Sequence, residues 1–170
     1  MKALLGYLSI VLLIVAVVGA VLLSTPLGER PLTALFAVGD VEPVDFAALR
    51  PSEDPNWFLV CPPSLCGTGA NAESPMFDGP LDRLRARWRE VVAAQPRLEL
   101  LTEYEGGLQF DYVQRSARFR FPDIITVRFI AVSPSQSTLA IYSRAVYGSS
   151  DLGVNRERIE AWLALVTEGL

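Results

Sequence analysis

The chain has 170 residues, of which 51% are hydrophobic, with a formal net charge of −4 and no histidine. The acidic balance argues against a nucleic-acid-binding protein, whose binding domain is normally basic. The absence of histidine excludes Ser-His-Asp and Cys-His catalysis and the HExxH zinc motif, and with two cysteines it leaves us expecting neither a metal nor a cofactor.

The chain opens with an uncharged apolar segment directly after Lys2. About 20 apolar residues in a helix are enough to cross a bilayer. We therefore predict a transmembrane signal anchor over residues 1–24, a linker over 25–40 and an extracytoplasmic domain over 41–170. The position of Lys2 favours a single-pass protein of the cytoplasmic membrane whose domain faces the periplasm or the outside. Cleavage of the segment as a secretory signal, or its burial as a helix of a soluble protein, are the alternatives.

The two cysteines, Cys61 and Cys66, lie close together in the sequence CPPSLC. Outside the cytoplasm such a pair normally forms a structural disulfide. Free buried thiols and a redox-active pair are the alternatives, although the spacing differs from the C-x-x-C of redox motifs.

The first predicted strand covers residues 57–60, and a loop rich in Pro, Gly, Ser and Asn follows. A helix begins at Pro80, since proline suits the first helical position, and Pro96 ends it. Its apolar residues recur with the helical period and form one stripe: Leu81, Leu84, Trp88, Val91 and Val92.

Four strands are predicted after this helix, and a second helix closes the chain. The first two strands, 98–105 and 108–115, flank a Gly-Gly hairpin signal, and the second strand is expected to continue to Phe121. The other two cover 125–132 and 138–146. Asn155 is expected to cap the closing helix. This order predicts an α+β domain, a two-layer sandwich in which two helices cover one face of an antiparallel sheet of four to five strands.

Alternation along the strands places apolar side chains on one face of the sheet and arginines on the other. The predicted apolar face comprises Ala117, Phe119, Phe121, Ile125, Val127, Phe129, Leu139, Ile141 and Ala145. The predicted arginine face comprises Arg118, Arg120, Arg128 and Arg144. Like charges on adjacent strands repel, so the arginines are either solvated and paired with acids of the domain, or they bind a phosphate or carboxylate.

Arg115 falls on the apolar side of the predicted sheet. An unpaired buried charge is very costly. We therefore predict a structural ion pair between Arg115 and an aspartate, for which Asp123 and Asp151 are the candidates.

The segment YSRAVYGSSDLGVNRERI, residues 142–159, combines a strand end, a turn and a helix start, and a helix N-terminus favours anions. Its pattern S-R-x3-G-x2-D-L-G-x-N-R-x-R-I resembles that of the domain of unknown function 1499 family. PNWFLVCPP, ESPMF and VQRSARFRFPD agree with the resemblance, which extends from about Asp40 to the C-terminus. It implies a membrane-associated or exported domain and brings no established activity. The polar positions that match the family are Arg115, Ser116, Asp123, Ser143, Arg144, Asp151, Asn155 and Arg156.

The function that we expect is non-enzymatic binding by a membrane-anchored domain. The ligand would be an anionic small molecule, a lipid headgroup or an envelope protein, and no nucleic acid is expected. The candidate ligand-binding residues are Arg118, Arg128, Arg144, Asp151, Asn155 and Arg156. One alternative is a hydrolase or transferase of the cell envelope, with Asp123 or Asp151 as base and arginines stabilising an anionic transition state. The other alternative is a structural scaffold.

Overall fold

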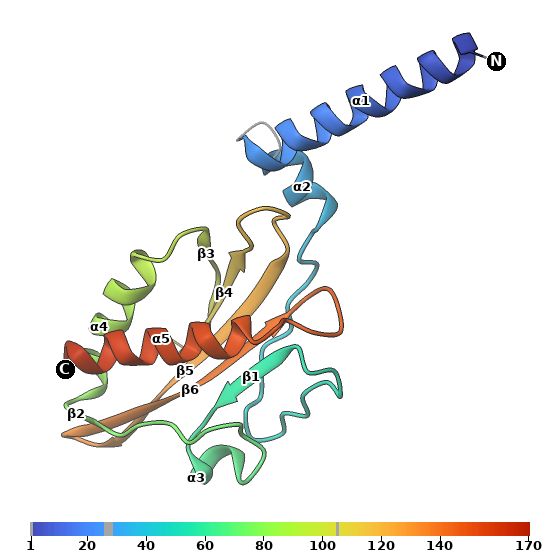
Figure 1. Cartoon of the computed structure of the whole chain (residues 1–170). Helices are drawn as coiled ribbons and strands as arrows, with labels where there is room; N and C mark the ends of the chain where they lie inside the picture. The colour runs from blue at the N-terminus through green and yellow to red at the C-terminus, as the bar shows by residue number, and fades with distance from the viewer. Residues whose placement is uncertain (1, 26–28, 105) are drawn as a thin grey trace. The chain divides into compact units, whose positions relative to one another are not determined.

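The protein is described by a computed structural model covering residues 2–25, 29–104 and 106–170 (Figure 1). The chain forms two compact units. The larger unit comprises residues 38–115 and 122–170, and the smaller unit comprises residues 1–37 and 116–121. Expectations that involve Met1, residues 26–28 of the predicted linker, or Glu105 fall outside the described residues.

The smaller unit contains helix α1 (Lys2–Ser24) and helix α2 (Glu29–Leu35). The N-terminal segment is helical as expected, and α2 occupies part of the segment predicted to be a linker. Among the residues that the structure describes, no helix combines the length and the apolar character needed to cross a membrane. The predicted transmembrane span is therefore not supported.

The larger unit contains an antiparallel sheet, as predicted, with six strands among its described residues. The strands are β1 (Trp57–Val60), β2 (Phe77–Asp78), β3 (Leu98–Tyr104), β4 (Gln109–Arg115), β5 (Pro122–Ser133) and β6 (Gln136–Ala145). Their order is β1-β6-β5-β4-β3, and the short β2 also pairs with β6. The sheet exceeds the expected four to five strands because β2 forms inside a segment that was predicted to be loop.

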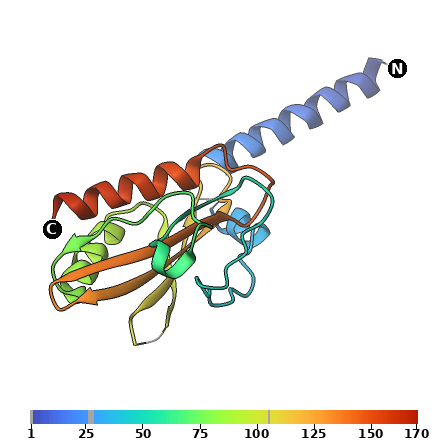
Figure 2. The same cartoon turned by 90° about the horizontal axis from the view of Figure 1, so that it is seen from below.

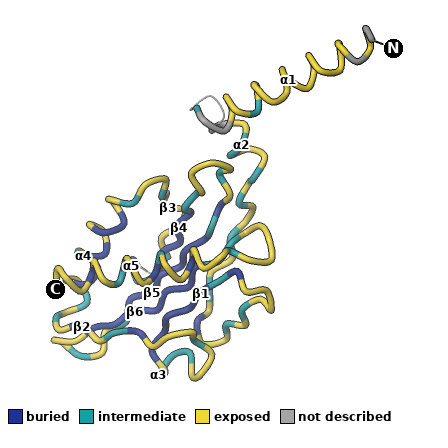
Figure 3. Tube along the Cα trace, in the orientation of Figure 1, coloured by how far each residue is buried: buried dark blue, intermediate teal, exposed yellow. Residues whose placement is uncertain are grey.

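One face of the sheet is covered by two helices, α4 (Leu81–Ala93) and α5 (Val154–Glu168). Trp88 of α4 is fully buried and contacts Trp162 of α5 and Phe129 of β5 edge-on. The buried strand residues of this core include Ile125, Val127, Phe129, Leu139 and Ile141. These residues belong to the predicted apolar face, and the structure confirms that they share it. Figure 3 shows the central strands as the most continuously buried part of the chain.

The opposite face of the sheet has a smaller apolar cover. Phe46 is buried there with Leu59 of β1 and Tyr142 of β6. Leu65 from the short helix α3 (Pro63–Cys66) packs against the same cluster. This face therefore lies partly under the segment that precedes β1 and under the cysteine loop.

Strand β4 ends at Arg115, so the expectation that it continues to Phe121 is wrong. The backbone NH of Ser116 donates to the carbonyl of Phe121 at 2.9 Å, and the NH of Phe121 donates to Oγ of Ser116 at 3.0 Å. These two bonds close residues 116–121 into a loop, in which Arg120 adopts a left-handed φ of 58°. The turn chemistry of serine thus ends a strand that the alternating pattern extends.

Both long helices of the larger unit start differently from expectation. Pro80 is the N-cap of α4 and not its first residue. Helix α5 begins at Val154 after Gly153, whose φ of 86° is left-handed, and Asn155 lies inside the helix. The acceptor for the first turn of α5 is the Asp151 carboxylate, whose Oδ2 accepts the NH of Asn155 at 2.7 Å.

Candidate functional site

A chain of polar side chains crosses the face of the sheet that lies opposite the two helices. Asp111 of β4 is completely buried. Its Oδ1 accepts the hydroxyl of Thr126 at 2.6 Å, and its Oδ2 accepts the hydroxyl of Tyr104 at 3.1 Å. Nη1 of Arg144 donates to Oγ1 of Thr126 at 3.2 Å. Thr126 therefore links a buried carboxylate on β4 to a guanidinium on β6.

Register explains why these groups meet. Asp111 is opposite Thr126, and Thr126 is opposite Tyr142 two residues before Arg144. Side chains that are opposite across a ladder, or diagonal to it, are close enough to interact. The Arg144 guanidinium also lies 4.9 Å from the centre of the Tyr142 ring, which Trp57 contacts edge-on.

Burial has the largest effect on the pKa values of Asp111 and Arg144. It raises the pKa of Asp111, although the hydrogen bonds from Thr126 and Tyr104 and the charge of Arg144 oppose the rise. Burial also lowers the pKa of Arg144, against the attraction of Tyr142 and Asp111. Each charge is thus partly desolvated. Asp111 is compensated first by its hydrogen bonds from Thr126 and Tyr104 and then by Arg144, and Arg144 is compensated by Tyr142 and Asp111.

A cavity of about 620 Å³ lies beside this network. Its polar wall comes from the sheet and contains Tyr104, Gln109 and Arg128. Nη1 of Arg128 donates to Oε1 of Gln109 at 3.2 Å, and Nε2 of Gln109 donates to the carbonyl of Val44 at 3.1 Å. These bonds hold the amide between the guanidinium and the covering segment. The volume is within the range of small-molecule sites.

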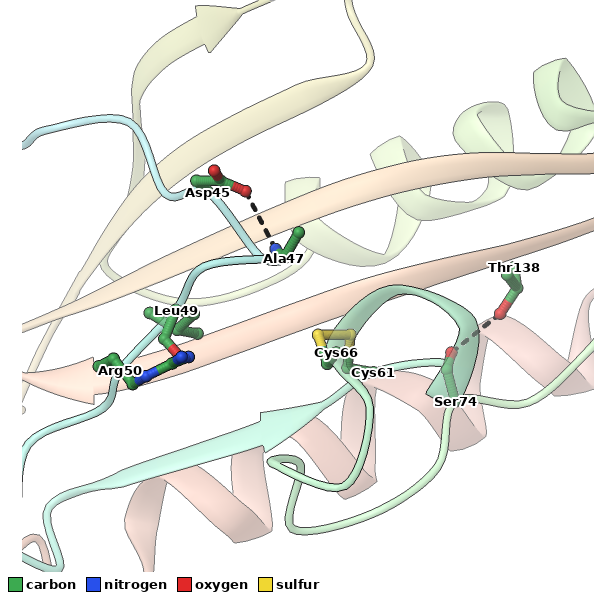
Figure 4. Close-up of a disulfide and its surroundings, with 8 residues drawn as sticks. All are labelled: Asp45, Ala47, Leu49, Arg50, Cys61, Cys66, Ser74 and Thr138. Atoms are coloured by element: carbon green, nitrogen blue, oxygen red, sulfur yellow. Dashed lines mark hydrogen bonds between the residues drawn. A yellow bond between two sulfur atoms is a disulfide. The ribbon is translucent and has the colours of Figure 1, made fainter.

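The other lining residues are mostly apolar and come from the segment that precedes β1 and from helix α3. They are Pro43, Val44, Asp45, Phe46, Ala47 and Leu65. Asp45 is their acidic member, and its Oδ1 accepts the NH of Ala47 at 3.0 Å (Figure 4). The lining of the cavity therefore combines an arginine with several apolar residues.

The disulfide between Cys61 and Cys66 is confirmed. Cys61 is buried in the same cluster as Phe46, and Leu65 of the cysteine loop lines the cavity. Beyond the disulfide, Ser74 accepts the hydroxyl of Thr138 at 3.1 Å (Figure 4). The cysteine loop thus packs against the sheet beside the cavity, and the segment after it is hydrogen-bonded to β6.

The predicted anion site at the start of α5 is occupied by a side chain of the protein itself. Asp151 accepts the backbone NH groups of Gly153 at 3.0 Å and Asn155 at 2.7 Å. Arg156 is exposed, pairs with Glu160 at 2.8 Å, and lies over the Phe58 ring. Asp151 and Arg156 do line a second hollow of about 400 Å³.

Asn155 is fully buried and joins three elements. Its Nδ2 donates to the carbonyl of Asn56 at 3.0 Å, and its Oδ1 accepts the hydroxyl of Ser143 at 2.5 Å. Arg158 donates to the same Oδ1 and, through Nη2, to Oδ2 of Asp123 at 2.6 Å. This network connects α5 to the sheet on the helical side.

Asp123 therefore has an ion-pair partner that the sequence did not suggest. Its partner is Arg158, and both side chains are largely buried, with exposed fractions of 16% and 8%. Arg115 lies at the end of β4, where its backbone NH donates to the carbonyl of Arg97 at 3.1 Å. Both aspartates considered as catalytic bases are thus engaged, Asp123 with Arg158 and Asp151 with the amides of α5.

The structure separates the six predicted ligand-binding residues. Arg128 and Arg144 lie on the same face of adjacent strands, as alternation predicted. Arg118 is exposed in the 116–121 loop and belongs to the smaller unit, as does Arg120. The remaining three, Asp151, Asn155 and Arg156, belong to the start of α5.

Sequence reasoning missed Asp111, Gln109 and Tyr104, which complete the polar wall. One signal was available. Asp111 lies between Phe110 and Tyr112 in a strand, so alternation places it on the face opposite those rings. The sequence alone does not show which segments pack over this face and bury Asp111.

The family profile described as Protein of unknown function (DUF1499) matches residues 68–166. No curated protein and no solved structure matches the chain. The matched region covers more than half of the chain and includes β4, β5, β6 and most of α5.

Proposed function

Since the chain belongs to the DUF1499 family of proteins of unknown function, we propose from its geometry that it is a binding protein for small amphipathic anions. The ligand carries a carboxylate or phosphate beside an apolar group. Its site is the cavity between the sheet and the covering segment. The observation that carries the proposal is the position of Arg128 in the wall of that cavity.

The polar wall supports recognition of an anion. A guanidinium donates two parallel hydrogen bonds to a carboxylate or phosphate, and such charge-assisted bonds are about twice as strong as neutral ones. Gln109 accepts one hydrogen bond from Arg128, which orients the guanidinium. The hydroxyl of Tyr104 is held at the same wall by Asp111.

The apolar lining residues support an amphipathic ligand over a free inorganic ion. Phe46 and Leu65 line the same cavity as Arg128. Burying apolar surface contributes about 25 cal/mol per Å². An aromatic or short aliphatic group attached to the anion gains this contribution, and inorganic phosphate does not.

Arg144 has a supporting place in this proposal. It is hydrogen-bonded to Thr126 and stacked near the Tyr142 ring. It adds a positive charge behind the wall and balances Asp111. We assign direct contact with the ligand to Arg128 and a positioning role to Arg144.

The proposal includes association with the cytoplasmic membrane and a domain outside the cytoplasm. Large hydrophobic side chains are exposed along α1, from Leu4 to Leu22. The Cys61–Cys66 disulfide fits an oxidising compartment. Fractionation of cells under conditions that block thiol exchange tests both parts, since the chain should sediment with membranes and carry no free thiol.

Isothermal titration of the full chain in detergent tests ligand binding. The probes are phenyl phosphate and benzoate, with benzamide as the uncharged match and inorganic phosphate as the anion without an apolar group. We expect the two aromatic anions to bind, benzamide not to bind, and inorganic phosphate to bind more weakly.

The matched variants are Arg128→Gln and Arg89→Gln, because both remove one positive charge and Arg89 is exposed on α4. A hydrogen bond to a charged group contributes about 1.5–3 kcal/mol, so Arg128→Gln should weaken binding at least tenfold. Arg89→Gln should leave it unchanged. Equal affinities in the two variants, or no binding of either aromatic anion, would refute the proposal.

A further inference from the structure

The 116–121 loop carries an exposed aromatic cluster. Phe119 and Phe121 are 47% and 39% exposed, and their rings stack with centres 5.6 Å apart. The Phe121 ring also contacts Phe36 edge-on, with centres 4.4 Å apart. Two neighbouring rings with this exposure form an apolar surface patch, and such patches indicate an interaction site.

The charges around this patch define the partner. The loop sequence is SARFRF, in which Arg118 and Arg120 alternate with the two phenylalanines and no residue is acidic. Aromatic rings prefer the interface between water and lipid, and arginines are attracted to anionic headgroups. An aromatic patch with a local positive charge therefore fits an anionic lipid surface.

The loop is built to present these side chains. Ser116 and Phe121 close it by the two hydrogen bonds described above. Arg120 adopts a left-handed backbone conformation directly before Phe121. A loop closed in this way loses less conformational entropy on binding than an open one.

The other members of the smaller unit agree with a lipid partner. The loop belongs to the same compact unit as α1 and α2. Large hydrophobic side chains of α1 are exposed, including Leu8, Ile10 and Val15. Large hydrophobic side chains in such positions favour contact with an apolar environment.

We propose that the 116–121 loop is a lipid-contact site, in which Phe119 and Phe121 enter the interfacial region of a membrane while Arg118 and Arg120 bind anionic headgroups. This inference rests on the membrane association proposed above. It is independent of ligand binding in the cavity, which belongs to the larger unit.

The test uses the full chain reconstituted with vesicles and an environment-sensitive fluorophore on a single introduced cysteine. The only two cysteines of the chain form a disulfide, so the label reacts with the introduced thiol. The label is attached at Ala117→Cys in the loop or, as a control, at Ala48→Cys, an exposed position of the larger unit. The vesicles contain phosphatidylcholine alone or with 30% phosphatidylserine, and a nitroxide on the headgroup reports contact.

We expect the label at position 117 to brighten several-fold and to be quenched by the headgroup nitroxide on anionic vesicles, and the label at position 48 to do neither. Each arginine contributes about fivefold to partitioning onto such a surface. Arg118→Gln with Arg120→Gln should therefore lower the insertion constant of the loop about 25-fold. The control pair Arg50→Gln with Arg89→Gln, with the same change in net charge, should not lower it. Phe119→Ser with Phe121→Ser should abolish the signal.

Flotation of the same vesicles distinguishes failure of the loop contact from failure of membrane association. If the chain floats with lipid but the label at 117 is neither brightened nor quenched, the loop contact is refuted and membrane association stands. If the chain does not float, both are refuted. If the signal at 117 rises with protein concentration in the absence of lipid, the patch is a self-association surface and the lipid proposal is overturned.

Discussion

Replacing Arg158 with methionine tests the network that joins α5 to the sheet. The guanidinium makes four side-chain hydrogen bonds, to Asp123, Ser143, Asn155 and Gln114. Methionine retains most of the aliphatic part of the side chain and removes all four donors. The substitution therefore removes the charge and the hydrogen bonds with little loss of packing.

The expected loss is large because the pair is buried. Removing one partner of a buried ion pair costs about 3–5 kcal/mol, since the other charge is left uncompensated. Asp123 is 16% exposed, so water compensates it only in part. The double variant Asp123→Asn, Arg158→Met should be more stable than Arg158→Met alone, because no buried charge remains. The coupling between the two positions should reach about 2 kcal/mol or more.

The pH dependence has a definite sign. Burial raises the pKa of Asp123, Arg158 opposes the rise and Asp151 adds to it. An aspartate with a raised pKa in the folded state holds its proton more tightly there than in the unfolded chain. This tighter proton binding stabilises the folded state. Its contribution to the free energy of unfolding is complete below the pKa that Asp123 has in the unfolded chain, and it is lost as the pH rises through the pKa that Asp123 has in the folded state. Without Arg158 that pKa rises further, so the variant should regain stability relative to the native chain when the pH is lowered from 7 to 5.

Urea unfolding followed by tryptophan fluorescence measures these free energies, because Trp88 and Trp162 are buried. The control is Arg156→Met, whose pair with Glu160 is more than half exposed on both sides. Exposed pairs of this kind contribute about 0–1 kcal/mol. A loss of less than 1 kcal/mol in Arg158→Met, or a pH dependence that matches the control, would refute the reasoning.

Three further outcomes follow from the same contacts, each measured by urea unfolding. Thr126→Val should lower the free energy of unfolding by about 2 kcal/mol, because it leaves the buried Asp111 carboxylate without one of its donors. Thr126→Ser should recover most of this loss. Equal stability of the two variants would contradict this role of the hydroxyl. Cys61→Ser with Cys66→Ser should cost about 2 kcal/mol, and a reducing agent should destabilise the native chain but not the variant. Asp151→Ala should cost about 1 kcal/mol by removing the acceptor for the first turn of α5, Asp151→Asn should cost less, and no loss in either variant would exclude the cap.

The site was only partly accessible from sequence. Alternation along β5 and β6 placed Arg128 and Arg144 on one face correctly, because the period of a strand holds wherever the strand persists. The same reasoning failed for Arg118, since the period carries no information about where the strand stops. The loop closed by Ser116 ends the strand after Arg115, and Arg118 and Arg120 therefore belong to the smaller unit.

The sequence by itself determined the features that depend on local period and spacing. These are the antiparallel sheet, the apolar stripe of α4, the disulfide between two nearby cysteines, and the family. The first three follow from interactions between residues that are close in sequence, or from alternation that any register must respect. The family follows from the residue pattern itself.

Only the tertiary structure decided which polar groups are buried and which of them meet. Arg158 is 35 residues from Asp123, and Gln109 is 65 residues from Val44. Such contacts depend on strand order, on the packing of α5 and on the segment that covers the far face of the sheet. Burial by these elements raises the pKa of Asp111 and forms the cavity beside Arg128. Neither property belongs to any single segment, because desolvation is a property of everything packed around a group.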